Sequence, residues 1–333
     1  MSETFNAIIF DNIDDVKKGR MTELSSSNLP DEKVHIDVAY STVNFKDGLA
    51  MSESSPIQIP QKIPMVGGID LAGTVTESAD SNWQAGDRVL VNGYGLSERH
   101  YGGYSQKACI NPDFLIRIPN AISLEQAMAI GTAGYTAMLC VLAIENHEVK
   151  PEDGKVLVTG ASGGVGSVAV SLLSSLGYEV TASSGRIAEN GDFLKGLGAS
   201  QLIERDKLAR DSQPLETETW AAVIDCVGGK TLATAIAQTK YSGIVTMCGL
   251  TGGSKFETTV IPFILRGVRL AGIDSVMAPL GIRQHAWDRL AKVLDLNKLA
   301  EIYTVEPLSK VPELASKILQ GKIKGRVVID VNA

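Results

Sequence analysis

A strand, a glycine-rich turn and a helix follow one another at residues 156–173, and this order constrains the fold of the chain more than any other feature. Residues 156–159 (VLVT) are apolar or β-branched, residues 160–166 (GASGGVG) form the turn, and residues 167–173 (SVAVSLL) open the helix. Backbone N–H groups at a helix N-terminus attract an anionic pyrophosphate. The segment therefore predicts a dinucleotide-binding unit.

Within the turn, Ala161 replaces the first glycine of the G-x-G-x-x-G pattern, and the other two glycines are present. We expect Gly163 to let the backbone approach the phosphates and Gly166 to let the helix pack closely on the strand.

The second strand of this unit, residues 178–183 (YEVTAS), is not followed by a carboxylate. An NAD site usually carries Asp or Glu about 20 residues beyond the glycines, to bind the ribose 2′-hydroxyl. Here the chain continues Ser184-Gly185-Arg186. A hydroxyl, an open backbone and a guanidinium suit a 2′-phosphate, so the predicted cofactor is NADP(H). The alternative is that Arg186 is a solvated loop cation.

Length and charge limit the classes of protein to consider. With 333 residues the chain exceeds the size at which one core stops growing, about 250–300 residues, so two domains are expected. A net charge of −7 argues against a nucleic-acid or anionic-membrane surface. The N-terminus lacks the plan of a signal peptide, and no continuous apolar run predicts a transmembrane helix, so a cytoplasmic location is expected.

The four cysteines form no C-x-x-C pair and lie far apart in the sequence, at Cys109, Cys140, Cys226 and Cys248. Three of them have apolar neighbours. The prediction is buried free thiols in a reducing compartment.

Strand and helix patterns divide the chain. The first 120 or so residues are predicted to be β-rich, with strands at 34–40, 73–77 and 87–91, followed by a helix from residue 123 to 142 that Ser123 caps and that Gly131 and Gly134 interrupt.

From residue 155 apolar strands alternate with helices, which predicts one doubly wound parallel sheet. Its six expected strands are residues 156–159, 179–183, 201–203, 221–226, 243–248 and 269–273. The tail ends in another strand, residues 325–331, and has no core of its own. We expect it to return to the N-terminal domain.

A glycine turn in mid-chain behind a β-rich head resembles the medium-chain dehydrogenase/reductase superfamily. Head segments similar to its quinone-oxidoreductase branch are residues 44–47 (NFKD), 68–75 (GIDLAGTV) and 131–134 (GTAG). Segments similar to the bacterial acrylyl-CoA reductase subgroup are residues 159–166 (TGASGGVG), 184–186 (SGR), 262–266 (PFILR), 272–276 (GIDSV) and 325–326 (GR). The resemblance runs nearly end to end.

This resemblance implies an α/β chain of two domains. One is a GroES-like, β-rich catalytic domain over residues 1–124 and 274–333. The other is an inserted Rossmann domain with a doubly wound parallel sheet, residues 125–273, that binds NADPH.

The superfamily contains zinc-dependent and zinc-free members. In this chain Ile69 stands where the family's usual His ligand stands, and no Cys precedes Asp47 at the other usual ligand position. No ligand spacing relates the four histidines, His35, His100, His147 and His285. The prediction is no catalytic zinc, which favours reduction of an activated alkene over alcohol oxidation.

The resemblance also implies the residues that line the cofactor groove. They are Phe45, Ser162, Gly163, Gly164, Val165, Ser184, Gly185, Arg186, Arg205, Leu250, Ile264, Ser275 and Arg326. Leu250 and Ile264 could instead belong to the apolar core, and Arg205 and Arg326 could be solvated charges.

Hydride transfer to the β-carbon of a conjugated carbonyl places negative charge on the carbonyl oxygen, which fixed donors would stabilise. The candidate donors are Asn44, Lys46 and Thr132. Alternatively, Asn44, Lys46 and Asp47 form a structural turn network.

The expected function is NADPH-dependent reduction of acrylyl-CoA to propionyl-CoA. One alternative is a broader quinone or enone oxidoreductase, and another is an NADPH-binding redox sensor with little turnover. The α-carbon would receive its proton from Tyr101, Tyr104 or water. The expected partners are a small-molecule substrate and a second copy of the chain, because the strand at 268–273 would form an open sheet edge at which relatives commonly pair.

Overall fold

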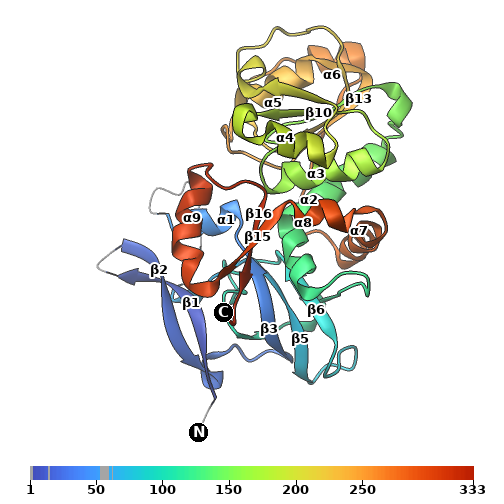
Figure 1. The fold of residues 1–333 in the computed structure, drawn as a ribbon. Helices are drawn as coiled ribbons and strands as arrows, with labels where there is room; N and C mark the ends of the chain where they lie inside the picture. Colours follow the sequence, from blue (N-terminus) through green and yellow to red (C-terminus); the bar gives the residue numbers. More distant parts are fainter. Residues whose placement is uncertain (1–2, 14–15, 53–59, 62) are drawn as a thin grey trace. The chain divides into compact units, whose positions relative to one another are not determined.

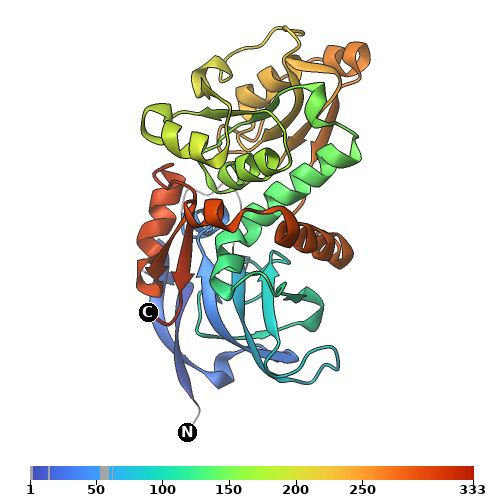
Figure 2. The same ribbon diagram turned by 45° about the vertical axis from the view of Figure 1, so that its right-hand side comes forward.

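The computed structural model describes residues 3–13, 16–52, 60–61 and 63–333. By its internal contacts the chain divides into two compact units (Figures 1 and 2). Unit 1 comprises residues 1–132, 275–291 and 303–333, and unit 2 comprises residues 133–274 and 292–302.

The limits of these units differ from the predicted domain ranges, 1–124 with 274–333 and 125–273. Helix α2 (Leu124–Asn146) crosses the first limit, and its break at Gly131, with φ 50° and ψ −161°, lies beside that limit. At the start of α2 the predicted N-terminal cap is confirmed, because Ser123 Oγ accepts a hydrogen bond from Gln126 N at 3.0 Å. Residues 292–302 belong to unit 2, where Lys298 Nζ donates to Leu197 O at 3.1 Å.

Unit 1 is mainly antiparallel. Its larger sheet has the order β15-β16-β3-β5-β6-β8, with β7 also paired to β3, among the described residues. These strands are β3 (Val34–Thr42), β5 (Asp70–Ser78), β6 (Arg88–Asn92), β7 (Lys107–Ile110), β8 (Ile116–Arg117), β15 (Tyr303–Pro307) and β16 (Arg326–Asp330). The smaller sheet, in the order β2-β1-β4, consists of β1 (Thr4–Ile13), β2 (Val16–Ser25) and β4 (Met65–Val66).

The predicted strands at 34–40, 73–77 and 87–91 are confirmed as β3, β5 and β6. The return of the C-terminal tail is also confirmed, since β16 pairs antiparallel with β3 and places Val328 opposite Thr42 (Figure 1). Helices α1 (Phe45–Ala50), α7 (Leu280–Val293) and α9 (Val311–Leu319) complete this part of the chain, with short 3₁₀ turns at Ser26–Asn28, Pro112–Phe114 and Leu308–Lys310.

The sequence did not predict the hairpin of β1 and β2. Ile8 and Phe10 pack in the main core of unit 1, whereas Ala7 and Ile9 pack with Val66 on the other side. Because both faces of β1 are covered, the strand lacks the alternation of apolar and polar residues that identifies a half-buried strand.

Unit 2 contains one parallel sheet in the order β11-β10-β9-β12-β13-β14, again counted over the described residues. Its strands are β9 (Val156–Val158), β10 (Val180–Ser184), β11 (Gln201–Glu204), β12 (Trp220–Asp225), β13 (Thr239–Met247) and β14 (Arg269–Gly272). All six match predicted segments, and β14 forms an edge of the sheet as expected.

Helices cover both faces of this sheet (Figure 1). They include α3 (Gly164–Ser175), α4 (Ile187–Leu197), α5 (Gly229–Ala237) and α6 (Ile261–Arg266). Unit 2 also contains α8 (Leu296–Ala300) and two 3₁₀ turns, at Pro151–Asp153 and Arg205–Lys207. This is the predicted doubly wound α/β architecture.

Helix α2 is the one helix among the described residues that is long and apolar enough to span a bilayer. Of its apolar window, 83% is buried inside the protein. That burial is typical of a core helix in a globular protein.

The glycine turn allows close packing of α3, as predicted for Gly166. A Cβ on Gly166 would lie 2.4 Å from the carbonyl oxygen of Gly160 and 2.6 Å from Ala161 Cα. Both contacts are with backbone atoms, which cannot rotate away as a flexible side chain can.

We expect Gly166→Ala to lower the free energy of unfolding by about 1–3 kcal/mol, because the added methyl group forces the turn and the helix apart. The matched control is Gly196→Ala in α4, where the added Cβ meets nothing within 4 Å. That variant should gain roughly 0.5–1 kcal/mol from helix propensity. Urea unfolding of both variants tests this, and similar effects of the two substitutions would contradict it.

Candidate functional site

The anion-binding half of the predicted site lies in unit 2, where β9 ends and α3 begins. Gly163 is the N-cap of α3, and Gly164 and Val165 occupy its first turn. The first N–H groups of a helix have no partner within the helix, so they can donate to an anion. Gly163 N itself donates to Gly160 O at 3.0 Å and closes the turn.

The residues predicted to bind a 2′-phosphate, Ser184, Gly185 and Arg186, lie at the end of β10, beside Ser162 and Arg205. Ser162 Oγ lies 3.1 Å from Ser184 Oγ, and Arg186 N donates to Ser184 Oγ at 3.1 Å. A Cβ on Gly185 would lie 2.9 Å from Arg205 Cζ, so that guanidinium packs against the glycine backbone. The fold therefore brings together two hydroxyls, an open backbone and Arg205, which the sequence had placed on separate segments.

Arg205 is largely exposed, with 58% of its side chain accessible, and its guanidinium Nε lies 3.6 Å from Asp206 Oδ1. An exposed pair of this kind contributes little to stability. The guanidinium can therefore exchange this partner for a phosphate at small cost.

Leu250 and Ile264 do not belong to the core of unit 2. Leu250 is 40% exposed and Ile264, on α6, is 71% exposed. The alternative that they are plain core residues is therefore wrong. Their assignment to the cofactor groove remains a prediction.

The polar half of the predicted site lies in unit 1, around the fully buried carboxylate of Asp70. Its Oδ2 accepts from Asn44 Nδ2 at 2.9 Å and from Thr132 N at 2.9 Å. Its Oδ1 accepts from Asn92 Nδ2 at 2.8 Å and from the Thr132 hydroxyl. Two predicted catalytic residues therefore donate to one internal carboxylate: Asn44 through its side chain, and Thr132 through both its backbone N–H and its hydroxyl.

The break in α2 makes this arrangement possible. At Gly131 a Cβ would lie 2.9 Å from Asp70 Oδ2 and 2.5 Å from Arg326 Nη2, and the positive φ of 50° disfavours other residues. Glycine at this position therefore lets Thr132 reach Asp70.

Arg326, which the sequence assigned to the cofactor groove or to solvent, is only 3% exposed. Its Nη1 donates to Asn44 Oδ1 at 3.0 Å and its Nη2 to Thr42 Oγ1 at 2.8 Å. Its Nε donates to Ala129 O at 3.2 Å. Arg326 is therefore not a solvated charge, and these contacts give it an internal structural role.

Asp47 is a second buried carboxylate of unit 1. It accepts from Asn44 N at 2.8 Å and from Ile69 N at 3.1 Å. Burial, together with the nearby charge of Asp70, raises the pKa of Asp47 to about 7. The alternative of a structural turn network therefore describes Asn44 and Asp47.

Tyr104, a proposed proton source, is fully buried, and its hydroxyl donates to Thr42 O at 3.2 Å. Burial raises the pKa of Tyr104 well above its usual range. Tyr101 is half-buried beside the cluster of Ala7, Ile9 and Val66.

Lys46 stands apart from the Asp70 network. Its Nζ lies 2.7 Å from Glu98 Oε2, and both side chains are half-buried. The Lys46 ammonium lowers the pKa of Glu98.

Two residues predicted to line the cofactor groove, Phe45 and Ser275, also lie in unit 1. Phe45 begins α1 and is half-buried. The backbone oxygen of Ser275 accepts a hydrogen bond from Arg283 Nη2 at 3.0 Å.

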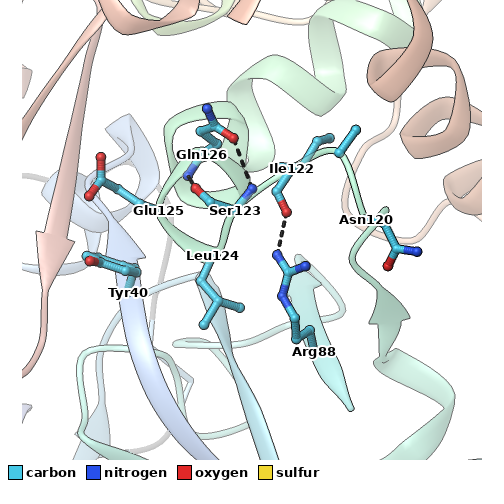
Figure 3. Close-up of a pocket in the computed structure, with 9 residues that line it drawn as sticks. Tyr40, Arg88, Asn120, Ile122, Ser123, Leu124, Glu125 and Gln126 are labelled. Carbon is cyan, nitrogen blue, oxygen red and sulfur yellow. Dashed lines mark hydrogen bonds between the residues drawn. The ribbon is translucent and has the colours of Figure 1, made fainter. Parts of the chain in front are cut away.

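A hollow of about 630 Å³ lies in unit 1 at the start of α2 (Figure 3). Its wall includes Tyr40, Arg88 and Glu125, and the Arg88 guanidinium donates to Ile122 O. The Glu125 carboxylate accepts from Tyr303 OH at 2.5 Å. None of the predicted site residues lines this hollow.

Sequence reasoning missed Asp70 and Asn92 as members of the site. A carboxylate within the apolar segment 69–72 (IDLA) was the available signal, because a charged side chain is rarely buried without partners. Among the described residues, no three His, Cys, Asp or Glu side chains come together as a group able to hold a metal ion.

The buried carboxyl of Asp47 should make stability depend on pH. Because its folded pKa of about 7 exceeds the usual value of 3.8, the folded state keeps a proton that the unfolded state loses in this interval. We therefore compare the free energy of unfolding of the native protein with that of Asp47→Asn. The difference, native minus variant, should fall by about 1.4 kcal/mol per pH unit from about pH 4 to pH 7 and should stay constant above pH 7.

Urea unfolding of both proteins across this range measures the difference, with Asp113→Asn, an exposed aspartate, as the control for loss of a charge. A difference that does not change with pH would contradict the assignment.

The comparisons with known proteins agree with this fold. Residues 30–120 match the alcohol dehydrogenase GroES-like domain, and residues 164–295 match the zinc-binding dehydrogenase family. The chain is 47% identical to the acrylyl-CoA reductase AcuI of Ruegeria pomeroyi over 332 residues, which cover 99% of this chain and 100% of the relative.

Two solved structures are also similar. The YhdH oxidoreductase of Salmonella enterica in complex with NADP has 45% identity and a TM-score of 0.94, covering 98% of this chain and 99% of the relative. YhfP of Bacillus subtilis with NAD bound has 41% identity and a TM-score of 0.95, covering 99% and 100%; its sequence carries the name putative quinone oxidoreductase.

These similarities extend over nearly the whole length of each chain, and they accompany the GroES-like and parallel-sheet units described above. The chain belongs to the medium-chain dehydrogenase/reductase superfamily, in the group that contains the acrylyl-CoA reductases and related quinone oxidoreductases.

Proposed function

We propose that this chain is a zinc-independent, NADPH-dependent reductase that adds hydride to the β-carbon of acrylyl-CoA and forms propionyl-CoA. The observation that carries the proposal is the gathering of Ser162, Ser184, Gly185 and Arg205 beside the N-terminus of α3. The full-length identity with a relative named acrylyl-CoA reductase supports the choice of substrate.

The residues present suit this cofactor. The first turn of α3 would hold the pyrophosphate, and Ser184, Arg186 and Arg205 would hold the 2′-phosphate. NADPH, when bound, supplies the hydride. The exposed apolar side chains of Leu250 and Ile264 would lie against the cofactor's apolar surfaces.

Lys46 is our candidate for the group that stabilises the developing carbonyl charge. An ammonium has three donors, so it can serve a carbonyl oxygen as well as Glu98. Asn44 and Thr132 are better described as positioning residues, because the side chains of both donate hydrogen bonds to the Asp70 carboxylate. By holding the start of α1, Asn44 sets the position of Lys46 two residues later.

The second candidate function is reduction of quinones or simple enones without a requirement for CoA. The relative from Bacillus subtilis named putative quinone oxidoreductase favours it, at 43% identity over 332 residues. The third candidate is an NADPH-binding redox sensor with little turnover.

We also propose that the protein acts as a cytoplasmic homodimer and binds neither nucleic acid nor membrane. The open edge at β14 and the exposed apolar side chains of Val260 and Leu265, beside and on α6, support pairing of two copies. Sedimentation analysis tests the dimer.

The proposed function predicts a preference among substrates. NADPH oxidation by the purified protein should show a kcat/KM for acrylyl-CoA far above that for crotonyl-CoA or a simple quinone. Faster turnover of the quinone would favour the second candidate. Tight NADPH binding without turnover of any of the three would favour the sensor.

Arg186→Ala should raise the KM for NADPH by roughly tenfold or more and leave the KM for NADH nearly unchanged, because only NADPH carries the 2′-phosphate. Lys195→Ala, which removes a more distant, exposed cation of α4, is the control. Equal effects of Arg186→Ala on the two cofactors would contradict the assignment.

Lys46→Ala should lower kcat for the alkene by about 10² while the Kd for NADPH stays unchanged, since loss of one donor to a developing oxyanion costs about this much. Glu98→Gln keeps the ammonium, so it should retain most of the activity. An unchanged kcat in Lys46→Ala would remove Lys46 from the chemistry.

A further inference from the structure

Two cysteines that lie 22 residues apart in the sequence meet at the carboxyl edge of the unit 2 sheet. Cys226 follows β12 and Cys248 follows β13, and these strands pair in parallel with Asp225 opposite Met247. The next residues of both strands are therefore neighbours, and the two sulfur atoms lie 3.9 Å apart. Both cysteines are free, and as whole residues they are half-buried.

This geometry suits a disulfide. Neighbouring strands lie about 4.8 Å apart, within the Cα separation of about 4.4–6.8 Å that disulfides span. Rotation about the side-chain bonds can bring the sulfurs from 3.9 Å to bonding distance. The predicted burial of these two cysteines is corrected here: they are half-buried, whereas Cys109 and Cys140 are buried.

The Cys248 thiol lies 3.5 Å from Asp225 O and 3.9 Å from the Cys226 sulfur. Hydrogen bonds with the thiols of Cys140 and Cys226 lower the pKa of Cys248 well below its usual range. The contact with Cys248, together with burial, raises the pKa of Cys226. A thiolate is the reactive form, and the proposal needs only that one thiol of the pair reacts and that the other lies within reach of it.

The pair is packed against the glycine turn and the loop that leads to Leu250. A Cβ on Gly160 would lie 3.4 Å from Cys226 Cβ, and one on Gly249 would lie 2.0 Å from Cys226 O. Cys226 N also donates to Thr159 Oγ1 at 3.0 Å, directly before the turn. A shift of Cys226 or Cys248 must therefore move backbone that we assign to the cofactor site.

We propose that Cys226 and Cys248 form a redox modification site, in which a hydroperoxide converts the two thiols into a disulfide that weakens dinucleotide binding by unit 2. The effect on binding rests on the proposed function; formation of the disulfide does not.

The reaction balances in two steps. The thiolate of one cysteine attacks one peroxide oxygen, the O–O bond breaks, and the leaving alkoxide takes a proton to become an alcohol, or water from hydrogen peroxide. The resulting sulfenic acid is attacked by the sulfur of the other cysteine, which forms the S–S bond and releases water. The two sulfurs together lose two electrons, and the peroxide gains them.

Peptide mapping of the full-length protein tests the disulfide. The reduced protein is treated with graded hydrogen peroxide, its remaining thiols are alkylated, and it is digested with trypsin without reduction. Cys226 lies in the tryptic peptide 211–230, Cys248 in 241–255 and Cys140 in 118–155. We expect 211–230 linked to 241–255, in the native protein and in Cys109→Ser. A link through 118–155 instead, or sulfinic acid without a link, would overturn the proposal.

Binding of NADPH is measured in parallel. Oxidation should raise the Kd for NADPH roughly tenfold, and dithiothreitol should restore it. Cys226→Ser and Cys248→Ser each lack one sulfur of the proposed disulfide. For each variant, the Kd for NADPH after peroxide treatment should therefore equal the Kd of the same variant before treatment. A linked protein with an unchanged Kd would overturn the effect on binding. If the reduced native protein does not bind NADPH, the proposed function fails and the binding effect with it, while the peptide map still decides the disulfide.

Discussion

The buried carboxylate of Asp70 is the constraint on which unit 1 depends. It accepts hydrogen bonds from Asn44, Asn92 and Thr132, and Asn44 in turn accepts from Arg326. A carboxylate buried without such partners would cost several kcal/mol. These donors come from the end of β3, from β6, from the break in α2 and from β16, so the network fixes segments that are distant in the sequence. Lys46 lies two residues beyond Asn44 and inherits its position from this network.

In unit 2 the corresponding constraint is steric. Gly166 and Gly249 leave room for backbone atoms that a side chain would displace, at 2.4 Å and 2.0 Å from the missing Cβ. The strands of a parallel sheet all end at one edge, and crossovers place the helix N-terminus there too. That edge carries the residues we assign to NADPH, and the thiols of Cys226 and Cys248 lie there as well. Cofactor binding and thiol chemistry would therefore share the same backbone.

Much of unit 2 could be predicted because its signals are local. Uninterrupted apolar strands identified the parallel sheet, and residues 162–165 and 184–186 are adjacent to strands whose ends could be located. The apolar neighbours of Asp70 could have indicated its burial, but its partners could not be predicted, since they come from three other segments. The β1–β2 hairpin was missed because Ile8 and Ile9 are buried on opposite faces. The meeting of Cys226 and Cys248 follows from the pairing of β12 with β13, which sequence spacing alone does not reveal.

The most direct test of the account follows the hydride itself. The protein, treated with a chelator, is given acrylyl-CoA and NADPH that carries deuterium at C4, in separate experiments for the two faces of the ring. Mass spectrometry and NMR then locate the label in the product. The account predicts deuterium at the β-carbon of propionyl-CoA from one of the two labelled forms, with undiminished rate in chelator. Label at the α-carbon, no label from either form, or a rate that requires an added metal ion would contradict it.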